Sequence, residues 1–118
     1  HRRKTGALIS VSLRLGAIVA DATLEQQAAL ETYGRAVGLA FQITDDCLDL
    51  VGDEQAMGKR IGKDSDRGKL TFPGLMGLEE SRSQAATLIE QACDALTIFA
   101  GKAEGLDALA RYVLLREH

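Results

Sequence analysis

The stretch that decides the fold runs from Thr23 to Leu50 and reads TLEQQAALETYGRAVGLAFQITDDCLDL. Thr23 and Gln26 stand at capping-box spacing, with the hydroxyl as helix N-cap and the amide three positions on. Gly34 and Gly38 stand four residues apart, where they would let a neighbouring segment pack closely. The stretch predicts one long helix with a buried face. The apolar pattern of that face runs through Ala28, Tyr33, Ala36, Val37, Ala40, Phe41, Thr44, Cys47 and Leu48.

Helical spacing continues on both sides of this stretch. Residues 7–20 hold a single charge, Arg14, and predict a helix that is buried on most sides. Residues 51–68 break the pattern with four glycines and predict a loop. Helix resumes near Pro73, a residue that suits a first helical turn. One face of the first helix would be formed by Leu8, Val11, Leu15 and Ile18.

Two further helical stripes lie toward the end of the chain. Ser81 and Gln84 predict a second capping box. Residues 88–99 carry one apolar stripe, and residues 106–114 form an amphipathic last helix. No strand pattern of any length is visible. The fold class that follows is all-α, a bundle of long antiparallel helices.

Composition narrows the class of protein. The chain has 118 residues, so it is one domain at most, and its 46% hydrophobic and 26% charged residues are those of a globular protein. A net charge of −3 and 4% aromatic residues give no reason to expect nucleic acid as a partner. Cys47 and Cys93 stand far apart, so neither a disulfide framework nor a zinc site is indicated. No apolar run is long enough to span a bilayer, and a reducing, cytoplasmic setting is expected.

The acidic cluster at the end of the long helix is the first candidate site. Asp45 and Asp49 are four apart, and Asp46 and Asp49 are three apart, so these like charges repel each other. The helix dipole also disfavours them at this end, and the two effects together cost about 1–2 kcal/mol. Something positive should offset this cost. Grouped carboxylates without His or Cys suit a hard cation such as Mg²⁺ together with a phosphate-bearing substrate.

A solvated acidic helix face is the alternative reading of the same three aspartates. Apolar residues interleave the acids, which favours a cavity lined by the cluster over a fully solvated face. The interleaved apolar residues are Phe41, Ile43, Leu48 and Leu50.

A basic, glycine-rich segment follows the acids. Residues 59–69 carry five cations separated by glycines, whose backbone N–H groups can approach a phosphate. Five residues stand between Gly62 and Gly68, and Leu70 follows Lys69, so this is not a P-loop. A solvated loop is the alternative, but the adjacent acidic cluster favours a metal-bridged polyphosphate. A Lys-Thr-Gly run at residues 4–6 would be a third phosphate contact, although alone it reads as a helix start.

At these residues the sequence resembles the trans-isoprenyl diphosphate synthases, also called polyprenyl synthetases. The shared elements occur in the family's order and approximate spacing, and they extend over the whole chain. They are Lys4-Thr5-Gly6, Phe41-Gln42, Asp45-Asp46-x-x-Asp49, Gly58-Lys59, Gly62-x-Asp64 and Gly68-Lys69-x-Thr71-x-Pro73.

The resemblance implies a fold and a reaction. The fold is an all-α bundle of the isoprenoid synthase type around a deep cavity, usually in a homodimer. The reaction joins an allylic diphosphate to isopentenyl diphosphate, with Mg²⁺ (or Mn²⁺) held by two aspartate-rich motifs. The allylic diphosphate ionises, the double bond of isopentenyl diphosphate attacks the cation, and a proton is lost. The expected product is a short-chain isoprenyl diphosphate of the farnesyl or geranylgeranyl type.

The resemblance also implies roles for single residues. Asp45, Asp46 and Asp49 correspond to the second aspartate-rich motif and would bind the metal, with Asp45 as the direct ligand. Lys4, Lys59 and Lys69 would bind the substrate diphosphate. Thr5 and Gln42 would place their dipoles near the reacting carbons, and with Lys4 and Lys59 they form the expected catalytic set.

The sequence also departs from the family. It has no second Asp-Asp pair, so the first aspartate-rich motif is missing, as are the residues that bind isopentenyl diphosphate. Together with a first residue, His1, that is not Met, this predicts that residues 1–118 are the C-terminal part of one synthase domain, inactive without the N-terminal part. A non-catalytic helical interaction subunit is the alternative, but it predicts erosion of the motif, and none has eroded. A terpene cyclase would lack the Gly-Lys segment.

Overall fold

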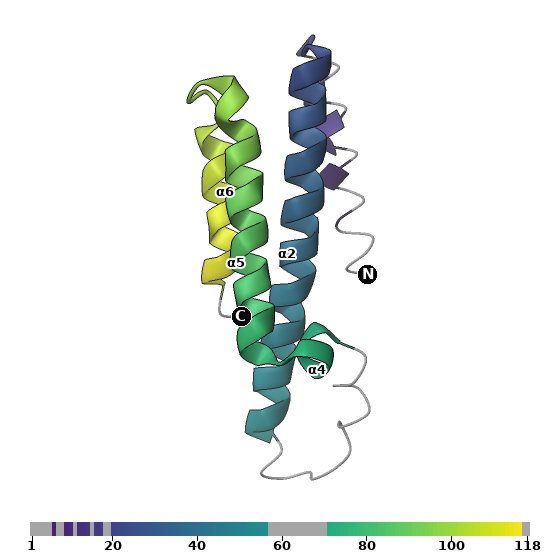
Figure 1. The fold of residues 1–118 in the computed structure, drawn as a ribbon, viewed down its shortest axis with the longest axis vertical. Coiled ribbons are helices and arrows are strands. Elements are labelled where there is room, and N and C mark those ends of the chain that lie inside the picture. Colours follow the sequence, from purple (N-terminus) through teal and green to yellow (C-terminus); the bar gives the residue numbers. More distant parts are fainter. Residues whose placement is uncertain are drawn as a thin grey trace.

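The computed structural model describes residues 6, 9–10, 12–14, 16–17, 20–56 and 71–116. In chain order its elements are α2 (Leu24–Ala56), α4 (Phe72–Met76), α5 (Leu78–Ala95), the 3-10 turn η1 (Leu96–Phe99) and α6 (Glu104–Leu115). The three long helices run side by side in alternating directions, and α4 crosses the lower end of the bundle (Figure 1). No residue in the described ranges is in a strand. The predicted all-α antiparallel bundle is confirmed.

The start of α2 is the predicted capping box. The Thr23 N–H donates to Gln26 Oε1 at 2.9 Å, and the Gln26 N–H donates to Thr23 Oγ1 at 3.1 Å. The end of α2 differs from the prediction, because the helix runs through residues 51–56, where a loop was expected. Adding turns to an existing helix is cooperative, and this offsets the roughly 1 kcal/mol that exposed Gly52 costs. Residues 57–68 of the predicted loop lie outside the described residues.

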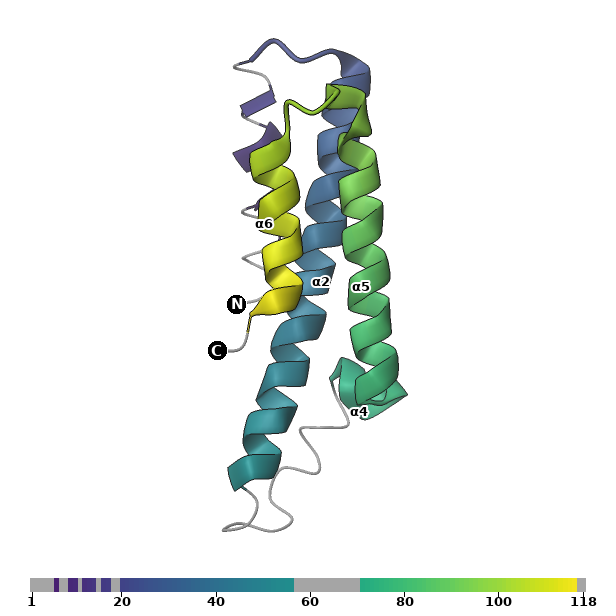
Figure 2. The same ribbon diagram turned by 90° about the vertical axis from the view of Figure 1, so that its left-hand side faces the viewer.

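The core is formed by most of the predicted face of α2 packed against α5 and α6. Ala28 of that face is exposed, contrary to the prediction, and Ile43, which was not assigned to it, is buried. Tyr33 is fully buried at the centre of the core, and its hydroxyl donates a hydrogen bond to the Leu106 carbonyl oxygen at 2.7 Å, which ties α2 to α6. Helices α2, α5 and α6 lie side by side in Figure 2. The apolar stripe predicted in residues 88–99 meets the same core. Buried core members are Tyr33, Ala36, Val37, Ala40, Ile43, Cys47, Ala85, Ile89, Ala92, Leu96, Ala110 and Val113.

The two glycines of α2 allow close packing, as predicted, and the structure shows that the neighbour is the N-terminal segment. A Cβ on Gly34 would lie 3.1 Å from Leu13 Cδ1, and a Cβ on Gly38 would lie 3.2 Å from the Gly6 Cα. Side chains at these positions would push the two segments apart.

Burial in the N-terminal segment is only partly as predicted. Its described residues from 9 to 17 are helical, and Ala17 is buried. Ser12, Arg14 and Gly16 are exposed, so the expectation of burial on most sides is wrong there. The face predicted from Leu8 onward lies outside the described residues.

Helices α4 and α5 follow each other closely. Pro73 stands in the first turn of α4, as predicted, and Thr71 caps that helix by accepting a hydrogen bond from the Gly74 N–H at 3.2 Å. The predicted second capping box is wrong. Ser81 lies inside α5, is fully buried, and donates its hydroxyl to the Gly77 carbonyl oxygen at 2.8 Å. The helix begins earlier because Gly77 takes a φ of 91°, which turns the chain directly from α4 into α5.

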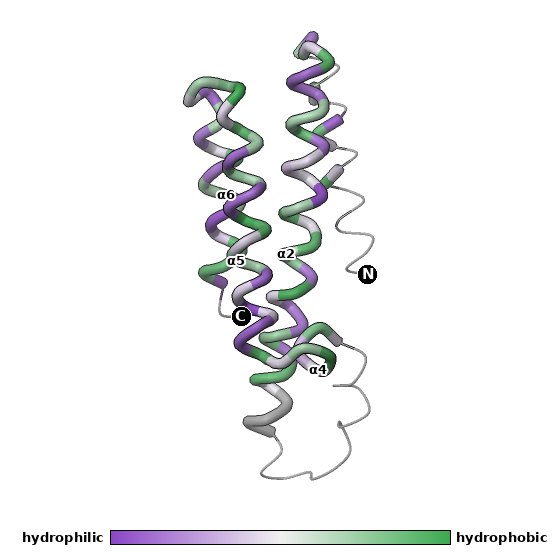
Figure 3. Tube along the Cα trace, in the orientation of Figure 1, coloured by the Kyte–Doolittle hydropathy of each residue, from purple (hydrophilic) through white to green (hydrophobic). Residues whose placement is uncertain are grey.

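The hydropathy of the helices is mixed along their length. Hydrophobic and hydrophilic positions alternate along α5 and α6 in Figure 3. Within the described residues, no helix combines the length and the apolar character that a membrane crossing requires.

The close approach at Gly38 makes a stability prediction. Gly38→Leu should lower the free energy of unfolding by about 1–3 kcal/mol, because the side chain collides with the backbone at Gly6. Gly52→Leu is the matched control in the same helix, since nothing lies within 4 Å of its added Cβ. The control should gain up to about 1 kcal/mol from helix propensity. Urea unfolding measures both, and equal effects would contradict the packing.

Tyr33 makes a prediction about pH. Burial raises its pKa to about 12, with smaller contributions from Cys93 and Asp107, while the unfolded chain keeps a value near 10. The folded state therefore favours the neutral phenol, and this stability is complete below about pH 10 and is lost as the pH rises toward 12. Relative to Tyr33→Phe, the protein should lose about 2–3 kcal/mol over that range. Urea unfolding of both proteins across the range measures it, and a constant difference would contradict the assignment.

Candidate metal and diphosphate site

The three aspartates of the candidate site lie on the last turns of α2, in three different environments. Asp46 is buried, with 4% of its surface exposed, Asp45 is half-buried, and Asp49 is exposed. Asp45 and Asp49 stand four residues apart and so project from one side of the helix. The motif is therefore divided between one interior carboxylate and two that reach the outer face.

Asp46 contacts the first residue of α4. Its Oδ2 accepts a hydrogen bond from the Phe72 N–H at 3.3 Å, and Phe72 packs against the core. This contact holds the segment after residue 70 against the end of α2. Asp46, one of the three aspartates predicted to bind the metal, thus helps to position the residues that follow the basic segment.

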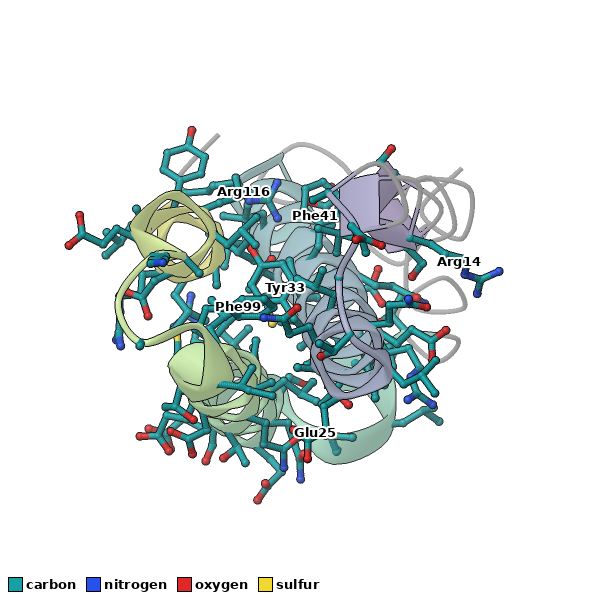
Figure 4. All side chains as sticks on the ribbon, turned by 90° about the horizontal axis from the view of Figure 1, so that it is seen from above. Arg14, Glu25, Tyr33, Phe41, Phe99 and Arg116 are labelled. Atoms are coloured by element: carbon teal, nitrogen blue, oxygen red, sulfur yellow. The ribbon has the colours of Figure 1, made fainter. Side chains whose placement is uncertain are left out.

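Asp45 is paired with Arg116, which directly follows α6. Arg116 Nη2 lies 2.8 Å from Asp45 Oδ1, and both side chains are largely covered, with 18% and 26% exposed. The same nitrogen donates to Thr44 Oγ1 at 2.7 Å and makes a longer contact of 3.4 Å with the Phe41 carbonyl oxygen. The guanidinium carbon stands 4.1 Å from the centre of the Phe41 ring (Figure 4). Arg116 thus joins the end of α6 to the acidic end of α2.

Sequence reasoning gave Arg116 no role in the candidate site. A cation was expected to offset the acidic cluster, and for Asp45 the structure supplies one from the chain itself. No pattern in the sequence pointed to this pairing, because Arg116 and Thr44, which it also contacts, stand 72 residues apart.

Gln42 lies on α2 one turn before the acids and is half-buried. The lysines and the threonine of the predicted site, Lys4, Thr5, Lys59 and Lys69, lie outside the described residues. Their roles, like those of the aspartates, stay predictions.

The chemistry of the donors fits a divalent cation in part. Two carboxylates on one helix face offer the hard oxygen ligands that Mg²⁺ and Mn²⁺ prefer. Among the described residues, no group of three or more His, Cys, Asp or Glu side chains is placed to hold a metal. Asp45 and Asp49 alone could therefore supply only some of the oxygen ligands that such a cation needs.

A separate pocket of about 250 Å³ opens where α5 turns into α6, and the three aspartates do not line it. Burial and a hydrogen bond to Asp107 raise the pKa of Cys93 to about 11, which keeps the thiol protonated. The hydrogen bond from Arg111 holds the pKa of Asp107 below its usual value. A protonated thiol is neither a nucleophile nor a good metal ligand. The pocket is lined by Cys93, Leu96, Thr97, Gly101, Ala103, Glu104 and Asp107.

Comparison with known proteins places the chain. It is 45% identical over 98% of its length to the farnesyl diphosphate synthase of Escherichia coli (strain K12), and 45% identical over its whole length to a dimethylallyltranstransferase of Fischerella ambigua (strain UTEX 1903). The match covers 40% and 34% of those proteins, so the chain spans well under half the length of either relative.

A solved structure agrees with these relatives. The fold matches a crystal structure of an FPP/GFPP synthase from Zymomonas mobilis with a TM-score of 0.73 and 40% identity, over 93% of this chain and 34% of that one. A sequence model of the family described as polyprenyl synthetase matches residues 1–113. The chain belongs to the polyprenyl synthetase family.

Proposed function

We propose that residues 1–118 form the C-terminal part of one prenyltransferase domain, which joins an allylic diphosphate to isopentenyl diphosphate and makes a short-chain isoprenyl diphosphate. The observation that carries the proposal is the family match over residues 1–113, in which the aspartate motif is intact on α2. Relatives named farnesyl diphosphate synthase, dimethylallyltranstransferase and geranylgeranyl diphosphate synthase support the reaction class.

The metal of the proposed reaction is Mg²⁺, with Mn²⁺ as a substitute. Asp45 and Asp49 would hold it from the outer face of α2, and the partly buried Asp45 is the stronger candidate because a half-covered carboxylate is less hydrated. When bound, the metal neutralises charge on the diphosphate leaving group. Asp46, the third member of the predicted motif, contributes by keeping Phe72 and α4 against α2.

The remaining residues would bind and orient the substrate. Lys4, Lys59 and Lys69 carry charge for the diphosphate oxygens, and fixed cations there stabilise the negative charge that develops as the C–O bond breaks. Thr5 and Gln42 would turn their dipoles toward the allylic cation. Apolar walls would keep out the water that otherwise quenches it.

The rest of the proposal concerns what the 118 residues need. They contain one of two aspartate-rich motifs, so we expect the complete site to form only with the other part of the domain. A homodimer is the expected assembly.

The first test replaces Asp45. In the full-length protein, Asp45→Asn should lower kcat by about a hundredfold or more at saturating Mg²⁺, because the carboxylate charge that binds the metal is lost. Asp94→Asn, at an exposed carboxylate on α5, is the matched control and should leave kcat unchanged. Radiolabelled condensation assays measure both. An unchanged rate in Asp45→Asn would contradict the metal role of Asp45, and no turnover by the unchanged protein would favour a non-catalytic helical subunit. Full turnover by residues 1–118 alone would contradict the need for a second motif.

The second test separates the two substrates. Lys59→Ala should weaken binding of the allylic diphosphate about tenfold or more, since it removes a charge-assisted hydrogen bond, and should change isopentenyl diphosphate binding much less. Lys102→Ala, at an exposed lysine in the turn before α6, is the control. Calorimetric titration with each diphosphate gives the dissociation constants. Equal weakening for both substrates would argue against the role given to Lys59.

A further inference from the structure

Oxygen atoms of Asp45, Thr44 and Phe41 form the seat of Arg116, which is the site on α2 where its guanidinium binds. The guanidinium contacts a carboxylate oxygen of Asp45, a hydroxyl oxygen of Thr44 and, at longer range, a carbonyl oxygen of Phe41. The Thr44 hydroxyl donates its own proton to the Phe41 carbonyl at 3.0 Å, so it presents a lone pair to Arg116. Every polar group of the seat therefore faces the cation as an acceptor. This arrangement suits a positive charge at the position of Arg116.

The seat does not use the guanidinium fully. Within the described part of the chain, the polar contacts of Arg116 run through Nη2, whereas an arginine that is matched to a carboxylate uses two nitrogens in parallel. Nε of Arg116 is buried and has no hydrogen-bond partner among the described residues. A buried donor without an acceptor weakens the hold on the side chain. The positive charge of Arg116 is well placed, but its hydrogen-bonding capacity is only partly used.

Two cations would compete for Asp45. A divalent ion bound to this carboxylate would stand within a few ångströms of the guanidinium, in surroundings that water screens poorly. The ion carries twice the charge and binds oxygen at shorter range, so its Coulomb attraction to Asp45 is stronger than that of Arg116. Arg116 is also attached where α6 has ended, at an extended residue, so it can leave without unwinding that helix.

We propose that Arg116 is the resident counter-cation of Asp45 in the metal-free protein, and that a divalent cation binding at Asp45 displaces it. Metal loading then frees the end of α6 from α2. This inference rests on the metal role proposed above for Asp45. It goes beyond that role because it makes Arg116 a competitor of the metal for Asp45.

Metal affinity gives the test. Arg116→Gln removes the competing charge, so Mn²⁺ should bind about fivefold more tightly or better, as measured by calorimetry and by electron paramagnetic resonance of free Mn²⁺. Arg111→Gln is the matched control, because Arg111 makes an ion pair of the same 2.8 Å length with Asp107 on the same helix. The control should leave Mn²⁺ affinity unchanged. Unchanged or weaker Mn²⁺ binding by Arg116→Gln would overturn the proposal, and weaker binding would show instead that Arg116 orients the carboxylate.

Thermal unfolding supplies a second readout. With a chelator present, Arg116→Gln should unfold at a lower temperature than the unchanged protein. Saturating Mg²⁺ should raise the Tm of Arg116→Gln by more than it raises the Tm of the unchanged protein. If this variant does not fold, Arg116→Lys keeps the charge without the guanidinium and should bind Mn²⁺ with close to the unchanged affinity. A large gain in affinity for Arg116→Lys would overturn the proposal.

Asp45→Asn separates the two proposals. If it abolishes Mn²⁺ binding while Arg116→Gln has no effect, the metal role stands and the displacement by Arg116 is wrong. If Mn²⁺ binds equally well to Asp45→Asn, the metal role of Asp45 is wrong and the inference fails with it.

Discussion

Helix α2 has an apolar face and carboxylates that later segments cover, and this constraint shapes the packing of the described residues. Its apolar face, centred on fully buried Tyr33, needs α5 and α6 as cover. Its aspartates at positions 45, 46 and 49 repel one another at helical spacing. Arg116 and the Phe72 amide meet two of its carboxylates, each from a different later part of the chain. The packing of α4, α5 and α6 follows from what α2 leaves unsatisfied.

The sequence predicted correctly those features that depend on residues close together in the chain. The Thr23–Gln26 box and the three-four spacing of α2 were read correctly because both depend on residues within one or two helical turns. The loop expected at residues 51–56 and the box expected at Ser81 were wrong for a related reason. Glycine content and cap spacing are local preferences, and both were outweighed by the helix already formed or by the turn at Gly77.

The site was predicted less completely than the fold. The spacing of the aspartates correctly identified residues that share a helix end, but not how each is covered. Asp46 faces inward because α4 returns to it, which no pattern within residues 41–53 indicates. Arg116 was missed as a partner because it stands 72 residues from Thr44, and only the folded bundle brings the two together. Contacts of this kind are set by topology and not by periodicity.

The contacts that attach α6 have a kinetic consequence. Tyr33 and Leu106 are 73 residues apart, and the bond from Arg116 to Thr44 closes a segment of similar size. Closing so long a loop costs chain entropy before any contact is gained, whereas α4 and α5 are consecutive and meet at once. Docking of α6 onto α2 is therefore expected to follow its local packing against α5, which precedes it in the chain. A chain caught before that step would show bare carboxylate charge at one end and an uncovered tyrosine in the middle.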